Sequence, residues 1–290
     1  MKAGTGTKPL VSIIVRTQGR RRTLLALALK SLVAQTYDNL EVIVVEDGSD
    51  SVEDIVATAN EMRSGVFIHQ PIERSGRCLA GNAGLAFATG EFLGFLDEDD
   101  ELYPEHIETL MFAITRTPHF RLAYGRAHKV LCDGLAEDDV SMVSSAPDIG
   151  MLPFSRTSLW QQNRFPIQAA VFARTLYEAH GGLDPELELL EDWDLWLRFS
   201  ANEDFLAVDA YTSLYRMPVR KKDTKEREAS HEKWRPIVIA KHHDLYGLHR
   251  FEDIETLLRQ IVLQLSFRAA AAAAITALFD RIKNFWKQDA

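Results

Sequence analysis

The sequence has few cysteines, no excess of positive charge and no long hydrophobic run, and each shortage excludes a class of protein. Its two cysteines, Cys78 and Cys132, lie far apart and lack the spacing of metal ligands. This excludes zinc ribbons and disulfide scaffolds and favours a reducing compartment. Lys and Arg number 33 against 42 Asp and Glu, and the net charge of −9 disfavours nonspecific binding to nucleic acid.

The apolar runs are too short for a membrane span. The longest, residues 269–279, contains a threonine and falls short of the roughly 20 residues that a spanning helix needs. The N-terminal stretch MKAGTGTKP has no apolar segment of signal-peptide length. We therefore expect a cytoplasmic protein. Its 290 residues, 46% of them hydrophobic, suffice for one large domain or for one domain with an appendage.

The short motifs of several enzyme classes are also missing. There is no Gly-x-x-x-x-Gly-Lys-Ser/Thr loop, which disfavours a P-loop kinase or NTPase. No Gly-x-Gly-x-x-Gly follows the first or second predicted strand, because Gly81 and Gly84 lie inside a helical stretch. A Gly-x-Ser-x-Gly elbow and a His-Glu-x-x-His motif are absent as well, so neither a serine hydrolase nor a zinc hydrolase is supported.

Apolar periodicity over the first hundred residues alternates between that of strands and that of helices. Short β-branched or apolar runs predict buried strands at residues 11–15, 41–46, 66–69 and 92–96. Helical spacing predicts helices at residues 24–33, 52–62 and 78–88, with Pro104 opening another. This alternation predicts an α/β fold with a mainly parallel sheet covered by helices on both faces.

The pattern is looser from residue 121 to 220. Strands are predicted at 122–124 and 169–172, a helix ending at 178–182 and an amphipathic helix at 192–201. We expect a mobile polar loop at 133–157 and a solvated linker in the charge run 220–228.

The C-terminal segment carries a heptad seam of apolar residues from Ile254 to Trp286, broken by Arg268. We therefore divide the chain into a disordered tail (1–8), a main domain (9–220), a linker or helical segment (221–250) and a long amphipathic helix (251–290). The apolar stripe of that helix must be covered. Self-association, a partner domain, the inner face of the membrane and the chain's own main domain all remain open as its cover.

Acidic residues stand at the ends of two predicted strands, where open parallel sheets bind their ligands. Asp47 follows the second strand, and four carboxylates, 97–100, follow the fourth. Asp97 and Asp99, two apart on an extended turn, offer the hard oxygen ligands that suit Mg²⁺ or Mn²⁺ shared with a diphosphate. The alternative is a solvated loop that caps the next helix.

A second acidic group, Glu191, Asp192 and Asp194, opens a predicted helix. Carboxylates at a helix N-terminus are stabilised by the helix dipole, so capping is one interpretation. A carboxylate that reaches a substrate hydroxyl can instead act as a general base. The helix N-terminus is expected to lower the pKa of Asp192 and keep it ionised.

Four segments resemble family 2 glycosyltransferases of the GT-A fold, in the order and spacing of that family. They are VSIIVRT at 11–17, SLVAQTYDNLEVIVVEDGSD at 31–50, ATGEFLGFLDEDDELYP at 88–104 and GGLDPELELLEDWDLWLR at 181–198. The resemblance covers roughly residues 9 to 220. It implies a Rossmann-like GT-A domain, to which the C-terminal helical extension is added.

The resemblance implies a role for six residues. Asp47 would bind the nucleotide base, Asp97 the ribose or the metal shell, and Asp99 the divalent cation, Mn²⁺ or Mg²⁺, on the donor diphosphate. Thr17 and Arg77 would join the donor site, and Asp192 would be the general base. The expected reaction transfers a sugar from a nucleotide diphosphate sugar to a hydroxyl of a saccharide or lipid-linked acceptor, with inversion, in surface polysaccharide or glycoconjugate synthesis.

Two competing functions remain. A sugar-phosphate nucleotidyltransferase would need a glycine-rich basic first loop, which Gly19 and the arginines after it echo only faintly. A non-catalytic scaffold that kept the fold is opposed by the complete set of acidic residues.

Three positions depart from the family pattern. Arg16 stands where a proline is usual, Ala80-Gly81-Asn82 replaces Ala-Arg-Asn, and Met217-Pro218 stands where a histidine is frequent. Basic residues nearby could compensate for that histidine; they are Arg216, Arg220, Lys221 and Lys222. Residues 133–165 are expected to form the acceptor pocket.

Overall fold

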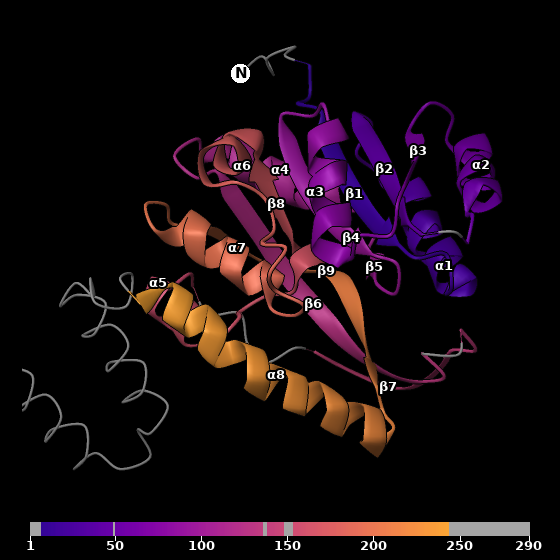
Figure 1. Cartoon of the computed structure of the whole chain (residues 1–290). Coiled ribbons are helices and arrows are strands. Elements are labelled where there is room, and N and C mark those ends of the chain that lie inside the picture. Colours follow the sequence, from indigo (N-terminus) through magenta and orange to yellow (C-terminus); the bar gives the residue numbers. More distant parts are fainter. Residues whose placement is uncertain (1–6, 49, 136–137, 148–152, 244–290) are drawn as a thin grey trace, which may run out of the picture.

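A nine-stranded sheet runs through the centre of the protein (Figure 1). The computed structural model describes residues 7–48, 50–135, 138–147 and 153–243. The strand order is β3-β2-β1-β4-β8-β6-β9-β5, with β7 paired to β6. The four strands predicted first are parallel to one another; they are β1 (Val11–Thr17), β2 (Leu40–Asp47), β3 (Phe67–Ile72) and β4 (Phe92–Asp97).

The second half of the sheet is mixed, so the prediction of a mainly parallel sheet holds only for the first half. Its strands are β5 (Glu101–Leu102), β6 (Leu122–Asp133), β7 (Ser141–Pro147), β8 (Ala170–Ala173) and β9 (Leu206–Pro218). β8 lies antiparallel to both β4 and β6, whereas β6 and β9 are parallel. The reversal at β8 separates the two halves.

Helices cover both faces of the sheet, as the alternating pattern predicts. One face packs against α1 (Arg22–Val33), α2 (Glu53–Met62) and α4 (His106–Arg116). The other packs against α3 (Arg77–Phe87), α5 (Arg156–Gln161), α6 (Arg174–His180) and α7 (Glu191–Ser200). The 3-10 turn η1 (Ile167–Ala169) precedes β8. As predicted, α6 ends at a glycine, Gly181, whose φ of 77° lies in the left-handed region.

The apolar run of strand β1 is explained by its burial on both faces of the sheet. Ile13 and Val15 point into the core under α1 and α4, while Ile14 points into the core under α3. A strand buried on both faces carries apolar side chains on both, and the polar Ser12 within this run is buried with a hydrogen bond to Glu41. Helix α3 comes so close to β1 that a side chain at Gly84 would meet Ile14, which explains a glycine within this helix.

Three predictions about local structure were wrong. Helix α4 begins at His106 rather than Pro104, because residues 104 and 105 form a turn in which the His106 N–H donates to the Tyr103 carbonyl. The expected loop at 133–157 contains strand β7 and the start of α5. Among the described residues β7 pairs with β6 alone and is exposed, so it needs no apolar alternation. The charge run at 220–228 is not a linker but lies mostly in helix α8 (Lys221–Lys241), which agrees with the helical alternative given for residues 221–250.

Two other predictions fall on parts of the chain that are not described. Most of the predicted N-terminal tail (residues 1–6 of 1–8) and all of the C-terminal helix at 251–290 lie outside the described residues. Across the described ranges, every helix is too short or too polar to cross a membrane.

Candidate active site

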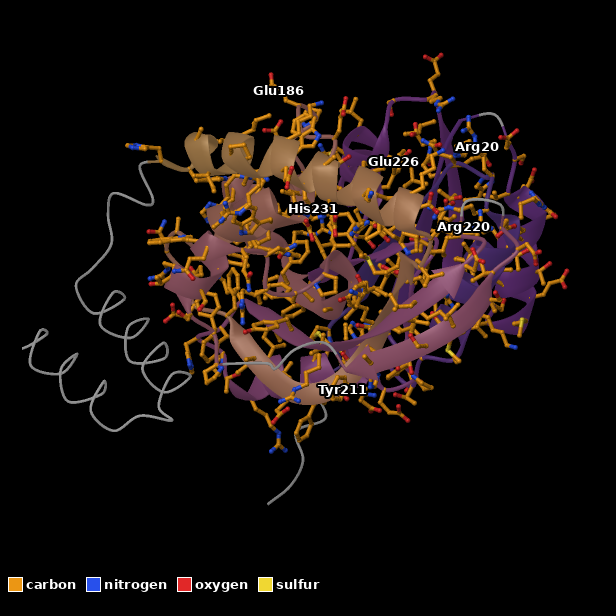
Figure 2. All side chains as sticks on the ribbon, turned by 90° about the horizontal axis from the view of Figure 1, so that it is seen from below. Arg20, Glu186, Tyr211, Arg220, Glu226 and His231 are labelled. Carbon is orange, nitrogen blue, oxygen red and sulfur yellow. The ribbon has the colours of Figure 1, made fainter. Side chains whose placement is uncertain are left out.

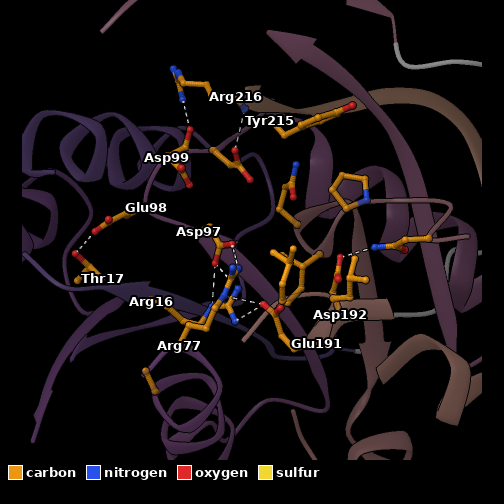
Figure 3. Close-up of a pocket in the computed structure, with 18 of the residues that line it drawn as sticks. Arg16, Thr17, Arg77, Asp97, Glu98, Asp99, Glu191, Asp192, Tyr215 and Arg216 are labelled. Atoms are coloured by element: carbon orange, nitrogen blue, oxygen red, sulfur yellow. Dashed lines mark hydrogen bonds and ion pairs between the residues drawn. The ribbon is translucent and has the colours of Figure 1, made fainter. Parts of the chain in front are cut away.

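A cavity of about 670 Å³ opens where β1, β2 and β4 end. The first turn of α7, the loop before η1, the end of β9 and helix α8 complete its walls. All six residues that the sequence predicts for the site line it; they are Thr17, Asp47, Arg77, Asp97, Asp99 and Asp192. In Figure 3, Asp192 enters from one side, Thr17 and Asp99 lie on the other, and Asp97 lies between them.

The acidic turn after β4 gathers three carboxylates. Oxygens of Asp97, Asp99 and Asp100 all lie within 4.8 Å of one another, which suits a hard divalent cation. Asp100, which the sequence did not single out, is buried and accepts a hydrogen bond from the Arg216 backbone N–H at 3.1 Å. Burial and the charges of Asp99 and Asp97 raise the pKa of Asp100 well above its ordinary value.

Arg16 and Arg77 join Asp97 to Glu191 in a ring of four charges (Figure 3). Arg16 donates to Asp97 Oδ1 from Nε at 2.9 Å and from Nη2 at 2.5 Å, and its Nη1 lies 3.2 Å from Glu191 Oε1. Arg77 Nη2 lies 3.1 Å from Asp97 Oδ2, and its Nε lies 2.9 Å from Glu191 Oε1. Although burial opposes ionisation, both arginines hold the pKa of Asp97 below its ordinary value.

Asp97 therefore has an arginine partner on each of its two oxygens, and a bound cation would share this carboxylate with Arg16 and Arg77. Arg16 stands where the resemblance led us to expect a proline, and the sequence analysis assigned it no role. Arg16 belongs to β1 and pairs with Glu191 of α7, which lies 175 residues away along the chain. Because an arginine buried with two carboxylate partners is costly to leave unpaired, Arg16 fixes α7 relative to β4.

Thr17 and Asp99 belong to a second polar group beside the acidic turn. The Thr17 hydroxyl donates to Glu98 and accepts from the Gly19 N–H at 2.9 Å. Arg21 bridges Glu98 and Asp99, with Nε–Oε1 and Nη1–Oδ2 distances of 2.7 and 2.6 Å. This group holds the loop after β1 against the acidic turn.

Asp47 lies at the end of β2 and is 2% exposed. Its two oxygens accept hydrogen bonds from the backbone N–H groups of Ser75 at 2.6 Å and Gly76 at 3.0 Å. Gly76 has a φ of 95° and directly precedes Arg77, the first residue of α3. Asp47 therefore anchors the turn that starts α3 and brings Arg77 to the cavity.

Asp192 lies in the first turn of α7. Its Oδ2 accepts a hydrogen bond from Asn163 Nδ2 at 2.6 Å, and its Oδ1 accepts from the Trp193 N–H at 2.8 Å. Burial and the adjacent Glu191 raise the pKa of Asp192 to about 6. The expectation of a lowered pKa was wrong, because the helix N-terminus is buried beside a second carboxylate.

Asp194, two residues further along α7, faces away from the cavity. It is fully buried and accepts from His242 Nε2 at 2.8 Å, Lys241 Nζ at 2.7 Å and Arg198 Nε at 3.0 Å. Lys241 and His242 lie at the C-terminal end of α8. We call these four residues the Asp194 clamp, because they fix the end of α8 to the helix that carries Asp192.

The sequence missed the contribution of α8. This helix runs along the lower edge of the molecule in Figure 1, and Figure 2 shows His231 along its length. Arg227 and His231 line the cavity from positions i and i+4, which share one helix face. Only that spacing within the charge run could have indicated them.

Comparison with known proteins identifies the class. The sequence profile of "Glycosyl transferase family 2" matches residues 12–136. The Escherichia coli K12 protein "Putative colanic acid biosynthesis glycosyl transferase WcaA" is 31% identical over 193 residues, 66% of each chain. An uncharacterized glycosyltransferase of Rickettsia prowazekii, RP339, is 26% identical over 66% of this chain and 58% of its own length. This chain thus spans about two thirds or less of these relatives.

Solved structures agree in fold. The crystal structure of S. aureus TarS has a TM-score of 0.62 at 17% identity, over 90% of this chain and 44% of TarS. TarS 1–349 in complex with UDP-GlcNAc has a TM-score of 0.55 at 16% identity, over 93% of this chain and 71% of that one. The fold is of the GT-A type, and the chain belongs to glycosyltransferase family 2.

Proposed function

We propose that this protein transfers a sugar from a nucleotide diphosphate sugar to an acceptor hydroxyl, with inversion at the anomeric carbon. One observation carries the proposal. Residues from β1, β2, α3, β4 and α7, chosen on sequence grounds, line a single cavity. That cavity combines an acidic cluster that could hold a cation with a carboxylate on its other side, which is the arrangement that in-line displacement needs.

The donor would lie over the acidic turn. Asp97, Asp99 and Asp100 would hold Mn²⁺ or Mg²⁺, and a bound cation would neutralise charge on the leaving diphosphate. Thr17, Asp47 and Arg77 would contact or shape the donor site. TarS has a similar fold and has been crystallised with UDP and with UDP-GlcNAc, which supports a nucleotide sugar donor here.

Asp192 would accept the proton of the attacking hydroxyl. With a pKa of about 6, it is mostly ionised at neutral pH and is a stronger base than an exposed aspartate. The acceptor oxygen attacks the anomeric carbon from the side opposite the diphosphate, its proton passes to Asp192, and the bond to the diphosphate breaks. The reaction needs no covalent intermediate.

The catalytic unit would extend beyond residue 220 to include α8, because Arg227 and His231 line the cavity. We propose a saccharide or lipid-linked acceptor in surface polysaccharide or glycoconjugate synthesis, which the name of WcaA supports. The C-terminal segment 251–290 would join a second copy, a partner domain or the cytoplasmic membrane surface.

A panel of nucleotide sugars, starting with UDP-GlcNAc, tests this function and its competitors. Each donor is incubated with Mn²⁺, with and without saccharide acceptors, and the released product is identified. Release of nucleoside diphosphate supports glycosyl transfer. Release of pyrophosphate from a sugar phosphate and a nucleoside triphosphate would establish a nucleotidyltransferase, and binding without turnover of any donor would indicate a scaffold.

A further inference from the structure

Asn163 makes a direct hydrogen bond to the carboxylate that we propose as the base. Its Nδ2 lies 2.6 Å from Asp192 Oδ2, while the Trp193 N–H binds the other oxygen. Each carboxylate oxygen thus has one protein donor and keeps lone pairs for an acceptor proton. Two donors at opposite oxygens stop the carboxylate from rotating.

The loop that carries Asn163 is fixed to α7 on both sides. Before it, Trp193 Nε1 donates to the Leu159 carbonyl at 2.6 Å. After it, the ring of Phe165 packs on Trp196 with a centroid distance of 5.2 Å, and on Tyr124 at 4.2 Å. Asn163 therefore keeps its position relative to Asp192, although it lies 29 residues earlier in the chain.

The carboxylate also decides which way the Asn163 amide faces. An ionised carboxylate only accepts hydrogen bonds, so the amide must present its nitrogen. The opposite atom, Asn163 Oδ1, is buried and has no hydrogen-bond partner among the described residues. Within that part of the chain, the side chain makes its single hydrogen bond to Asp192. If Asn163 served only to hold the fold of this loop, its side chain would not need to direct its one hydrogen bond to Asp192 and leave Oδ1 buried without a partner.

We propose that Asn163 is a positioning residue that fixes both the orientation and the charge of the Asp192 carboxylate. The proposal rests on Asp192 being the general base. A hydrogen bond to the charged form of an acid favours that form. Burial and Glu191 raise the pKa of Asp192, and Asn163, the Trp193 N–H and Arg77 oppose that rise. Arg164, Arg227 and His231 also line the cavity, and variants of Asn163 leave all of these groups in place.

The test measures the titration of Asp192 directly and needs no known substrate. The full chain is labelled with ¹³C at the aspartate carboxyl carbon, and the Asp192 signal is assigned by its loss in Asp192→Asn. The wild-type signal is expected to titrate near pH 6. In Asn163→Ala the midpoint should rise by about one pH unit, since a hydrogen bond to a charged group is lost.

Two further variants make the test decisive. Asn163→Asp keeps the side-chain shape but replaces the donor with a second acid, so the pair should bind a proton at a still higher pH. Gln162→Ala alters an exposed neighbour in the same loop and should leave the midpoint unchanged. Unchanged midpoints in both folded Asn163 variants would overturn the proposal.

Kinetics separate this proposal from the proposed function. With the donor and acceptor found in the panel, the acid limb of kcat/KM should move upward with the NMR midpoint in Asn163→Ala, and part of the lost rate should return at higher pH. A packing defect would instead lower the rate equally at every pH. If Asp192→Asn keeps its turnover, the base assignment fails. If Asp192→Asn is inactive while the Asn163 variants keep the wild-type profile, only the role of Asn163 fails.

Discussion

The Asp194 clamp should contribute substantially to the stability of this protein. Asp194→Asn keeps the shape of the side chain but removes the charge that faces His242, Lys241 and Arg198. Asp194 is fully buried, whereas the Lys241 side chain is 35% exposed and keeps a second partner, Asp184, at 2.5 Å. Breaking a buried ion pair costs about 3–5 kcal/mol, and the partial exposure of Lys241 brings our expectation down to about 3 kcal/mol.

The effect should depend on pH in a defined direction. The pKa of Asp194 is lowered from its ordinary 3.8, because the hydrogen bond from His242 and the charges of Arg198 and Lys241 outweigh burial. Its stabilising contribution is therefore complete above about pH 4 and is lost as the pH falls through the folded-state pKa. The difference between wild type and Asp194→Asn should be full at pH 7 and should shrink below about pH 4.

Urea unfolding, followed by tryptophan fluorescence, measures this difference. We expect a midpoint lower by roughly 1 M at pH 7 for Asp194→Asn. Asp204→Asn is the matched control, since that carboxylate is 66% exposed in its pair with Arg156 and should matter by less than about 0.5 kcal/mol. Equal stability of the two variants at pH 7, or a difference that persists unchanged at pH 3, would refute the reasoning.

Three further predictions follow from the site. Excess EDTA should abolish transfer, and Mn²⁺ or Mg²⁺ should restore it; full activity in excess chelator contradicts the cation site. Asp99→Asn should lose Mn²⁺ affinity in calorimetry while its melting temperature stays within a few degrees of wild type. The rate kcat/KM should fall about tenfold per pH unit below pH 6, where Asp192 becomes protonated; a limb near pH 4 would point to another base. Arg16→Met should lower the free energy of unfolding by about 3 kcal/mol, measured in urea, because it leaves Asp97 and Glu191 without a buried cationic partner. A stability equal to wild type would show that Arg77 alone suffices to pair both carboxylates.

The first half of the fold could be predicted because its strands and helices are regular. β1, β2 and β4 are short apolar runs buried on both faces, and the helices between them keep a clear apolar period. The prediction of a buried strand at 66–69 was correct for the strand but wrong for its burial, because β3 lies at the edge of the sheet and leaves Ile68 exposed. β7 and β9 gave no such signal, since β7 is exposed and β9 is half-buried along most of its length. Helix α8 has so many charges that its sequence resembles a linker, and only Trp234, Val238 and Ile239 pack on the core.

The site could be predicted only where its residues follow strand ends or belong to a motif. Those rules placed the six expected residues at one cavity. Asn163 and His231 obey neither rule, because what brings them to the cavity is the packing of distant segments. Arg16 follows the first predicted strand, but its partners Asp97 and Glu191 are set by the fold and could not be read from the sequence. The pKa of Asp192 had the wrong predicted sign for the same reason: the sequence showed a helix start, but not that it would be buried beside Glu191.

The most direct test of the account is a paired measurement on Asp192→Asn. This change removes the proton acceptor while keeping the size of the side chain. Calorimetry with UDP and Mn²⁺ gives the affinity for the nucleoside diphosphate, and the initial rate is measured with the donor and acceptor identified in the panel. We predict that turnover falls by at least about a hundredfold with nucleotide affinity nearly unchanged. Near-normal turnover, or loss of UDP binding instead of turnover, would contradict the assignment of Asp192 as the general base.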